Sequence, residues 1–127
     1  CKAVLPHMKS AGYGRIISAS SINGFAGAFG QTNYAATKAG VAGFTRALCK
    51  ETGRYGVTVN AVAPGFIKSE MSDSMPKEVI SAGIAQIPVG RIGTAQDMGY
   101  TYLLLASKEA SFISGITLHA NGGAMPM

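Results

Sequence analysis

The sequence has few of the features that mark disulfide-rich, metal-binding or membrane proteins. It holds two cysteines, Cys1 and Cys49, among 127 residues, too few for a disulfide framework and without the spacing of a metal site. Cys49 falls on the apolar face of a predicted helix, where we expect a buried thiol. No apolar run approaches the roughly 18 residues that a membrane-spanning helix needs. We therefore expect no metal and no membrane contact, and a reducing cytoplasm as the default location.

Charged residues are also scarce, and those present are not concentrated anywhere. Only 13% of the residues are charged, and the 11 basic and 6 acidic residues give a net charge of +5. Nucleic-acid binders usually gather their basic residues on one stripe, so we expect no nucleic-acid partner. The basic balance is compatible with a phosphate-bearing cofactor or an acidic partner. With 47% hydrophobic residues, the chain is expected to be globular and well buried.

A glycine-rich phosphate-binding loop is missing as well. No G-x-G-x-x-G motif follows a predicted strand, and G12-Y-G14 lacks the third glycine and leads into a strand instead of a helix. The first ten residues, CKAVLPHMKS, are typical of the end of a helix. A chain of this length can form one domain with a real core, but we expect residues 1–127 to be part of a longer protein.

The segment Gln31–Gly43, QTNYAATKAGVAG, carries the clearest chemical signal. Either Thr32 or Asn33 is predicted to cap a helix over about 33–53, which the alanines favour. Tyr34 and Lys38 are four residues apart and so share one face of that helix. A free phenol ionises only near pH ~10, but a neighbouring ammonium stabilises the phenolate and eases proton exchange. Alone, such a pair more often reflects one packed ring and one solvated amine.

The predicted strands place further hydroxyl groups near this pair. Buried strands are predicted at 15–20, 57–63 and 115–120, and unbroken apolar strands of this kind are typical of parallel sheets. Ligands of such sheets bind beyond the carboxyl ends of the strands, where Ser20 and Ser21 follow the first strand. A last helix is predicted over about 95–107, with Thr94 as its N-cap. His7 and His119 are expected to be structural.

Taken together, the order of these motifs resembles the second half of the short-chain dehydrogenase/reductase family. Ser21, then Y-x-x-x-K, then N-A-V-A-P-G follow one another in register, and the likeness extends to the terminal HANGG. It is greatest to 3-oxoacyl-(acyl carrier protein) reductases, followed by acetoacetyl-CoA reductases. The resemblance implies an α/β fold, a Rossmann-like doubly wound parallel sheet with covering helices. Residues 1–127 would form its carboxyl-terminal half, without the amino-terminal dinucleotide-binding half.

The same resemblance implies roles for particular residues. Ser21, which stands thirteen residues before the tyrosine, would be the catalytic serine, and Ser20 would be structural. Tyr34 would exchange the proton, and Lys38 would support it and bind the nicotinamide ribose. No metal takes part. The cofactor would be bordered by Tyr34, Lys38, Pro64, Gly65, Ile67 and Ser69, with Ser69 standing where the family usually has threonine.

The implied activity is the NAD(P)H-dependent reduction of a 3-oxoacyl thioester, carried by acyl carrier protein or CoA, in fatty acid synthesis. NADPH is expected and NADH remains an alternative, because residues that read the 2′-phosphate would lie upstream. A homotetramer built partly on the 33–53 helix is expected. The alternatives are an acetoacetyl-CoA reductase, which the segment 23–34 favours, another short-chain alcohol dehydrogenase, or a non-catalytic scaffold subunit.

Two segments are expected to enclose the substrate. Residues 70–90 are predicted to form a lid of two short helices, since long structured insertions are often functional. The loop 22–30 has no charged side chain and joins the two catalytic elements, so we expect it to wall the site. Within it, Phe25 and Phe29 are equally compatible with the core and with substrate contact.

Overall fold

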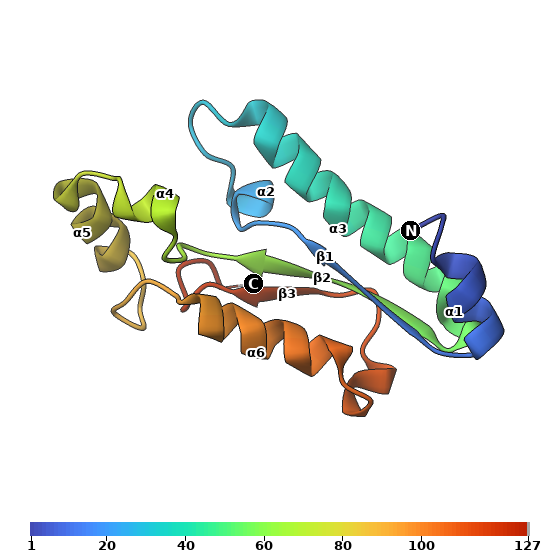
Figure 1. Ribbon diagram of the computed structural model, residues 1–127. Coiled ribbons are helices and arrows are strands. Elements are labelled where there is room, and N and C mark those ends of the chain that lie inside the picture. Colours follow the sequence, from blue (N-terminus) through green and yellow to red (C-terminus); the bar gives the residue numbers. More distant parts are fainter. Residues whose placement is uncertain (127) are drawn as a thin grey trace.

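A three-stranded parallel sheet is the centre of the computed structural model, which describes residues 1–126 (Figure 1). Its strands are β1 (Gly14–Ala19), β2 (Val57–Pro64) and β3 (Thr117–Ala120), in the order β1-β2-β3. The register of β1 and β2 begins with Gly14 opposite Val57, and that of β2 and β3 begins with Ala61 opposite Thr117. These strands confirm the predicted α/β class with a parallel sheet.

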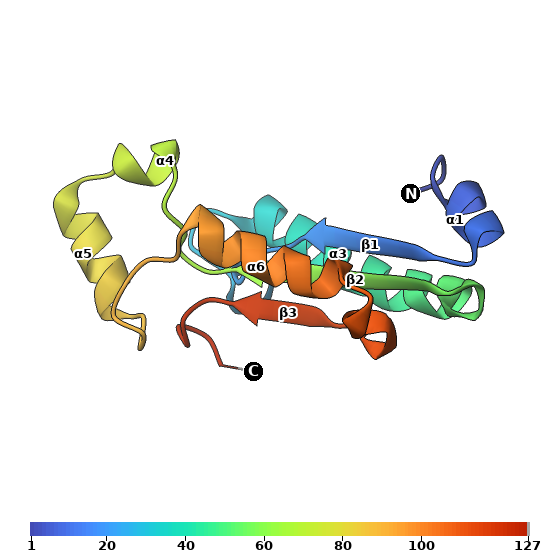
Figure 2. The ribbon, with the colours of Figure 1, turned by 60° about the horizontal axis from the view of Figure 1, so that its bottom comes forward.

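Helices cover both faces of this sheet, with α3 on one face and α6 on the other (Figures 1 and 2). This layering of helix, sheet and helix is the arrangement expected of a doubly wound fold. Within residues 1–126, no helix is both long and apolar enough to cross a membrane. The helical elements are α1 (Leu5–Ala11), α2 (Asn23–Ala26), α3 (Thr32–Thr52), η1 (Gly53–Tyr55), α4 (Glu70–Asp73), α5 (Lys77–Ala85), α6 (Ala95–Ala106) and η2 (Glu109–Phe112).

The core lies between α3 and the sheet, where apolar strand residues meet the helix. Ile16, Leu48, Val57 and Val59 form a buried cluster, and β2, with a strand on each side, is buried along nearly its whole length. Cys49 packs at the rim of this cluster and is half-buried. The prediction of a buried thiol is therefore only partly right, because the thiol lies near the helix surface and donates to the Arg46 carbonyl at 3.1 Å.

Helix α6 begins as predicted, with Thr94 as its N-cap. The Thr94 hydroxyl accepts a hydrogen bond from the Asp97 amide at 3.1 Å, and the Asp97 carboxylate accepts one from the Thr94 amide at 2.7 Å. The two bonds form a reciprocal capping box, which satisfies amides that the first turn of a helix leaves unpaired.

The predicted cap of α3 is wrong. Gln31 occupies the N-cap position without a side-chain cap, and Thr32 is already the first helical residue. Asn33 uses its Oδ1 to accept the neighbouring Tyr34 amide at 2.9 Å. Gln31 is engaged elsewhere, because its side-chain oxygen accepts a hydrogen bond from Asn23 Nδ2 at 2.9 Å.

Each strand differs from its predicted bounds by one or two residues, β1 by a shift of one residue toward the amino terminus. The last strand begins at Thr117 and not at Gly115, because Gly115 has φ +84°, a left-handed conformation that glycine adopts without strain and that belongs to a turn. Pro64 is the last residue of β2 and does not interrupt it. Proline has no N–H to offer the ladder, but its carbonyl accepts the Ile22 amide at 3.1 Å.

Candidate active site

A cavity of about 460 Å³ opens at the carboxyl ends of β1 and β2, where ligands of parallel sheets are expected. The end of β1 and the first turn of α3 form one wall, and the segment after β2 forms the other. None of the lining side chains is charged. The lining residues are Ser20, Ser21, Tyr34, Pro64, Gly65, Phe66, Ile67, Ser69, Met71, Ser72, Met75, Met98 and Tyr102.

Tyr34 and Lys38 lie together on one face of α3, as their spacing requires. Tyr34 borders the cavity and keeps 42% of its surface exposed. The Lys38 ammonium lies 5.5 Å from the centroid of the Tyr34 ring and donates to the Ala19 carbonyl at 3.0 Å. The last residue of β1 therefore holds a positive charge beside the phenol ring.

The two adjacent serines differ in what their hydroxyls do. Ser21 Oγ accepts a hydrogen bond from the Asn23 amide at 3.2 Å, which leaves its own proton available to a ligand in the cavity. Ser20 is 4% exposed and donates its proton to the Lys38 carbonyl at 2.8 Å. Of these two serines, only Ser21 can therefore donate to a ligand without losing a hydrogen bond within the chain.

The opposite wall contains four of the residues that the family resemblance assigned to the cofactor, Pro64, Gly65, Ile67 and Ser69. A Cβ at Gly65 would lie 2.7 Å from the Cβ of Asn121, so only glycine allows the chain to pass so close to the end of β3. Ser69 is the N-cap of α4, and its hydroxyl accepts the Ser72 amide at 3.3 Å. Its hydroxyl proton is not needed for that bond.

Several lining residues were not predicted from the sequence. Met98 and Tyr102 reach the cavity from α6, and burial raises the pKa of the Tyr102 phenol. The predicted lid does contain two short helices, but of the two only α4 borders the cavity, through Met71 and Ser72, together with Met75 from the segment that follows α4. The sequence predicted the helix over about 95–107 but did not indicate which of its residues point at the site.

The loop 22–30 does not wall this cavity, contrary to the prediction. No residue of the loop lines it; α2 packs on α3, and its Phe25 side chain extends to β3. There the Phe25 ring meets His119 edge-on, with 4.7 Å between the ring centroids. Phe29 is fully exposed, so in this chain Phe25 is a packing residue and Phe29 contacts neither the core nor the cavity.

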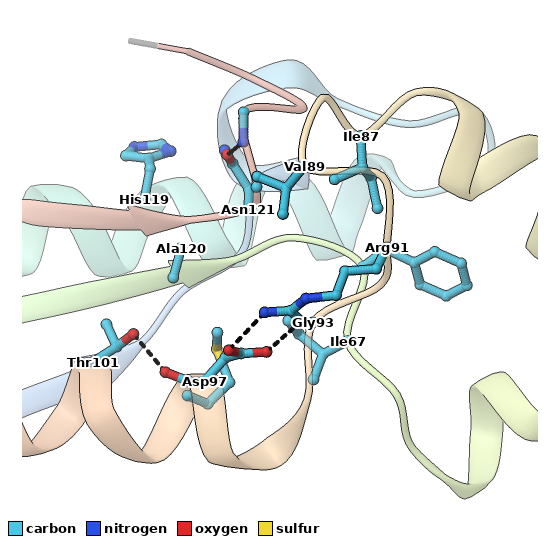
Figure 3. Close-up of a pocket in the computed structure, with 14 residues that line it drawn as sticks. Ile67, Ile87, Val89, Arg91, Gly93, Asp97, Thr101, His119, Ala120 and Asn121 are labelled. Atoms are coloured by element: carbon cyan, nitrogen blue, oxygen red, sulfur yellow. Dashed lines mark hydrogen bonds and ion pairs between the residues drawn. The ribbon is translucent and has the colours of Figure 1, made fainter.

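A second cavity, of about 360 Å³ (Figure 3), shares Phe66, Ile67 and Met98 with the first. Arg91 reaches across it and binds both carboxylate oxygens of Asp97, at 2.7 and 3.0 Å. Hydrogen bonds from Arg91, and then from Thr94, hold the pKa of Asp97 well below its usual range. This ion pair links the loop before α6 to the first turn of α6. The sequence analysis did not predict the pair.

Comparison with known proteins connects this geometry to a family. A family model described as enoyl-(acyl carrier protein) reductase matches residues 1–125. The chain belongs to the short-chain dehydrogenase/reductase family. The expected resemblance is thereby confirmed over almost the whole chain.

Individual members of the short-chain dehydrogenase/reductase family are identical to this chain at about half of the aligned positions. The chain is 51% identical to a 3-oxoacyl-[acyl-carrier-protein] reductase of Rickettsia prowazekii over 113 residues, which are 89% of this chain and 47% of that protein. It is 48% and 49% identical to proteins of the same name from Vibrio cholerae and Pseudomonas aeruginosa over 122 residues, 96% of this chain and 50% and 49% of theirs. The chain thus spans about half the length of the curated relatives it matches.

Proposed function

We propose that this chain is the carboxyl-terminal half of a nicotinamide-dependent reductase that converts a 3-oxoacyl thioester into the 3-hydroxyacyl thioester. One observation carries the proposal. The Tyr34 ring and the Ser21 hydroxyl border the same uncharged cavity, opposite the segment from Pro64 to Ser69. The similarity to relatives named 3-oxoacyl-[acyl-carrier-protein] reductase supports the choice of substrate.

The cavity is compatible with a nicotinamide and a ketone. Its volume of about 460 Å³ falls in the range of ligand sites, and an apolar wall with a few hydroxyls suits an uncharged amide and a carbonyl. We assign the cofactor contacts to Tyr34, Lys38, Pro64, Gly65, Ile67 and Ser69, and we propose NADPH, with NADH as the alternative. When bound, the nicotinamide would supply the hydride that reaches the carbonyl carbon.

The residues of this chain would handle the proton and the developing negative charge. Tyr34 donates its phenolic proton to the carbonyl oxygen as that oxygen becomes an alkoxide. Ser21 donates a hydrogen bond to the same oxygen, as an oxyanion-hole donor does. Lys38, held by the Ala19 carbonyl at 3.0 Å, keeps a positive charge beside the phenolate that remains and, by family resemblance, binds the ribose hydroxyls.

The complete protein is proposed to be a cytoplasmic homotetramer that takes substrates on acyl carrier protein or CoA. One exposed face of α3 supports contact between copies, because its residues are all small: Ala36, Gly40, Gly43 and Ala47. A Cβ at Gly40 or at Gly43 would meet no atom within 4 Å. Small side chains of this kind let a second helix approach closely.

Substrate assays on the complete protein test the proposal. Acetoacetyl-acyl carrier protein, acetoacetyl-CoA and crotonyl-CoA are each offered with NADPH and with NADH. We expect reduction of both ketones, with the higher kcat/KM on the carrier protein. A marked preference for acetoacetyl-CoA would favour the acetoacetyl-CoA reductase alternative. Turnover of crotonyl-CoA alone would indicate an enoyl reductase, and no turnover at all would favour the scaffold alternative.

A further inference from the structure

We propose that Ser20 and Gly24 are positioning residues that hold the Lys38 turn of α3 against the end of β1 and thereby place Tyr34 relative to Ser21. The inference rests on the proposed function, since it gives these two residues a task in the same site. Neither residue has to touch the substrate for this task. Both act on the backbone of α3.

Lys38 is tied to β1 through its backbone as well as its side chain. The Ser20 hydroxyl donates to the Lys38 carbonyl at 2.8 Å, and the Lys38 ammonium donates to the carbonyl of the preceding residue, Ala19, at 3.0 Å. Ser20 is 4% exposed, so water competes little for its bond. A carbonyl inside a helix is normally engaged by the amide four residues on, so the bond from Ser20 adds a link between helix and strand.

Gly24, in α2, packs directly against the same turn of α3. A Cβ at this position would lie 2.8 Å from the Lys38 carbonyl carbon and 2.9 Å from the Ala39 nitrogen, closer than non-bonded carbon atoms approach. These atoms belong to the helix backbone and cannot rotate away as a side chain can. The Gly24 amide also donates to the Ser21 carbonyl at 3.0 Å. Only glycine therefore lets the Ser21 loop lie directly against the Lys38 turn.

Any side chain at position 24 must widen the gap between the Ser21 loop and the Lys38 turn, because the atoms that it would meet are mainly helix backbone. Tyr34 lies one turn earlier on the same helix and would move with it, while Ser21 remains attached to the strand. Reacting groups are sensitive to such shifts, and a misplacement of about 1 Å can cost on the order of 100-fold in rate. We expect Gly24→Ala to lower kcat about 10- to 100-fold, and Ser20→Ala about three- to tenfold.

The test compares three variants of the complete protein. Gly53→Ala is the matched control, because Gly53 follows α3 at its far end, has φ −55°, and has no atom within 4 Å of an added Cβ. We measure kcat and KM for acetoacetyl-CoA, the pH dependence of kcat, and hydrogen exchange of the amides of residues 34–39. In Gly24→Ala and Ser20→Ala, kcat should fall with little change in KM, the pH profile should shift, and exchange at 34–39 should accelerate. Gly53→Ala should match the wild type.

The outcomes separate this inference from the proposed function. Wild-type kcat, pH profile and exchange in Gly24→Ala would overturn the inference, as would an equal loss in Gly53→Ala. If Gly24→Ala does not fold, Ser20→Ala decides alone, and an unchanged kcat and pH profile there would overturn the inference. If the wild-type protein reduces no ketone, the proposed function fails, and hydrogen exchange at residues 34–39 still tests the positioning of the turn.

Discussion

Replacing Tyr34 by phenylalanine tests the proton donor with little disturbance of the fold. The ring, its 42% exposure and its contact with the Lys38 ammonium are retained. Within residues 1–126 the Tyr34 hydroxyl makes no hydrogen bond, so we expect the free energy of unfolding to change by less than about 0.5 kcal/mol. The lost proton transfer is worth roughly 10²–10⁴-fold in kcat, or about 2.7–5.4 kcal/mol of barrier.

The assay follows NADPH oxidation by the complete protein with saturating acetoacetyl-CoA. Tyr102→Phe is the matched control, because Tyr102 lines the same cavity from α6 and burial raises the pKa of its phenol, which makes it a poorer proton donor. We expect Tyr102→Phe to retain kcat within about threefold. A Tyr34→Phe protein with more than a tenth of the wild-type kcat would refute the assignment of Tyr34 as the acid.

Four further predictions concern the serines, a helix cap, a histidine and the isolated chain. Ser21→Ala should lower kcat about 10²–10³-fold and Ser20→Ala at most about tenfold, and the reverse order would show that the serines are assigned the wrong way round. Thr94→Ala should lower the unfolding free energy by about 1 kcal/mol, whereas Thr32→Ala, which removes no cap, should change it by less than about 0.5 kcal/mol in denaturant titrations. Burial lowers the pKa of His119 below 6.5. The imidazole is therefore protonated at a higher pH in the unfolded chain than in the folded one, and the free energy of unfolding should fall as pH drops below about 6.5. His119→Gln should flatten the plot of melting temperature against pH. Residues 1–127 alone should not bind NADPH in a fluorescence titration, because they contain no glycine-rich phosphate-binding loop. They should also not run as a single species in gel filtration, because the outer edge of β1 has no partner strand within residues 1–126. A monodisperse fragment that binds NADPH would contradict this prediction.

The sequence by itself determined the class of fold and the elements that carry the site. Local patterns were sufficient for this, because unbroken apolar runs identify buried parallel strands and the four-residue spacing of Tyr34 and Lys38 fixes their common helix face. Thr94 was predicted correctly as a cap, since its partner Asp97 lies only three residues away. The wall from Pro64 to Ser69 was predicted from its place after a strand and from the family resemblance.

Only the tertiary structure decided which neighbours these elements meet. Gln31 lies at the start of α3 without a side-chain cap, and its side chain instead accepts a hydrogen bond from Asn23, eight residues earlier. Phe25 packs on His119, which is 94 residues away in the chain, and no residue of the 22–30 loop lines the cavity. The bond from Ser20 to the Lys38 carbonyl and the close approach of Gly24 likewise depend on how α2 and α3 pack on β1. Contacts between residues distant in sequence leave no periodic pattern. The family resemblance distinguished Ser21 from Ser20, but only the structure showed that the Ser20 hydroxyl is engaged by the Lys38 carbonyl.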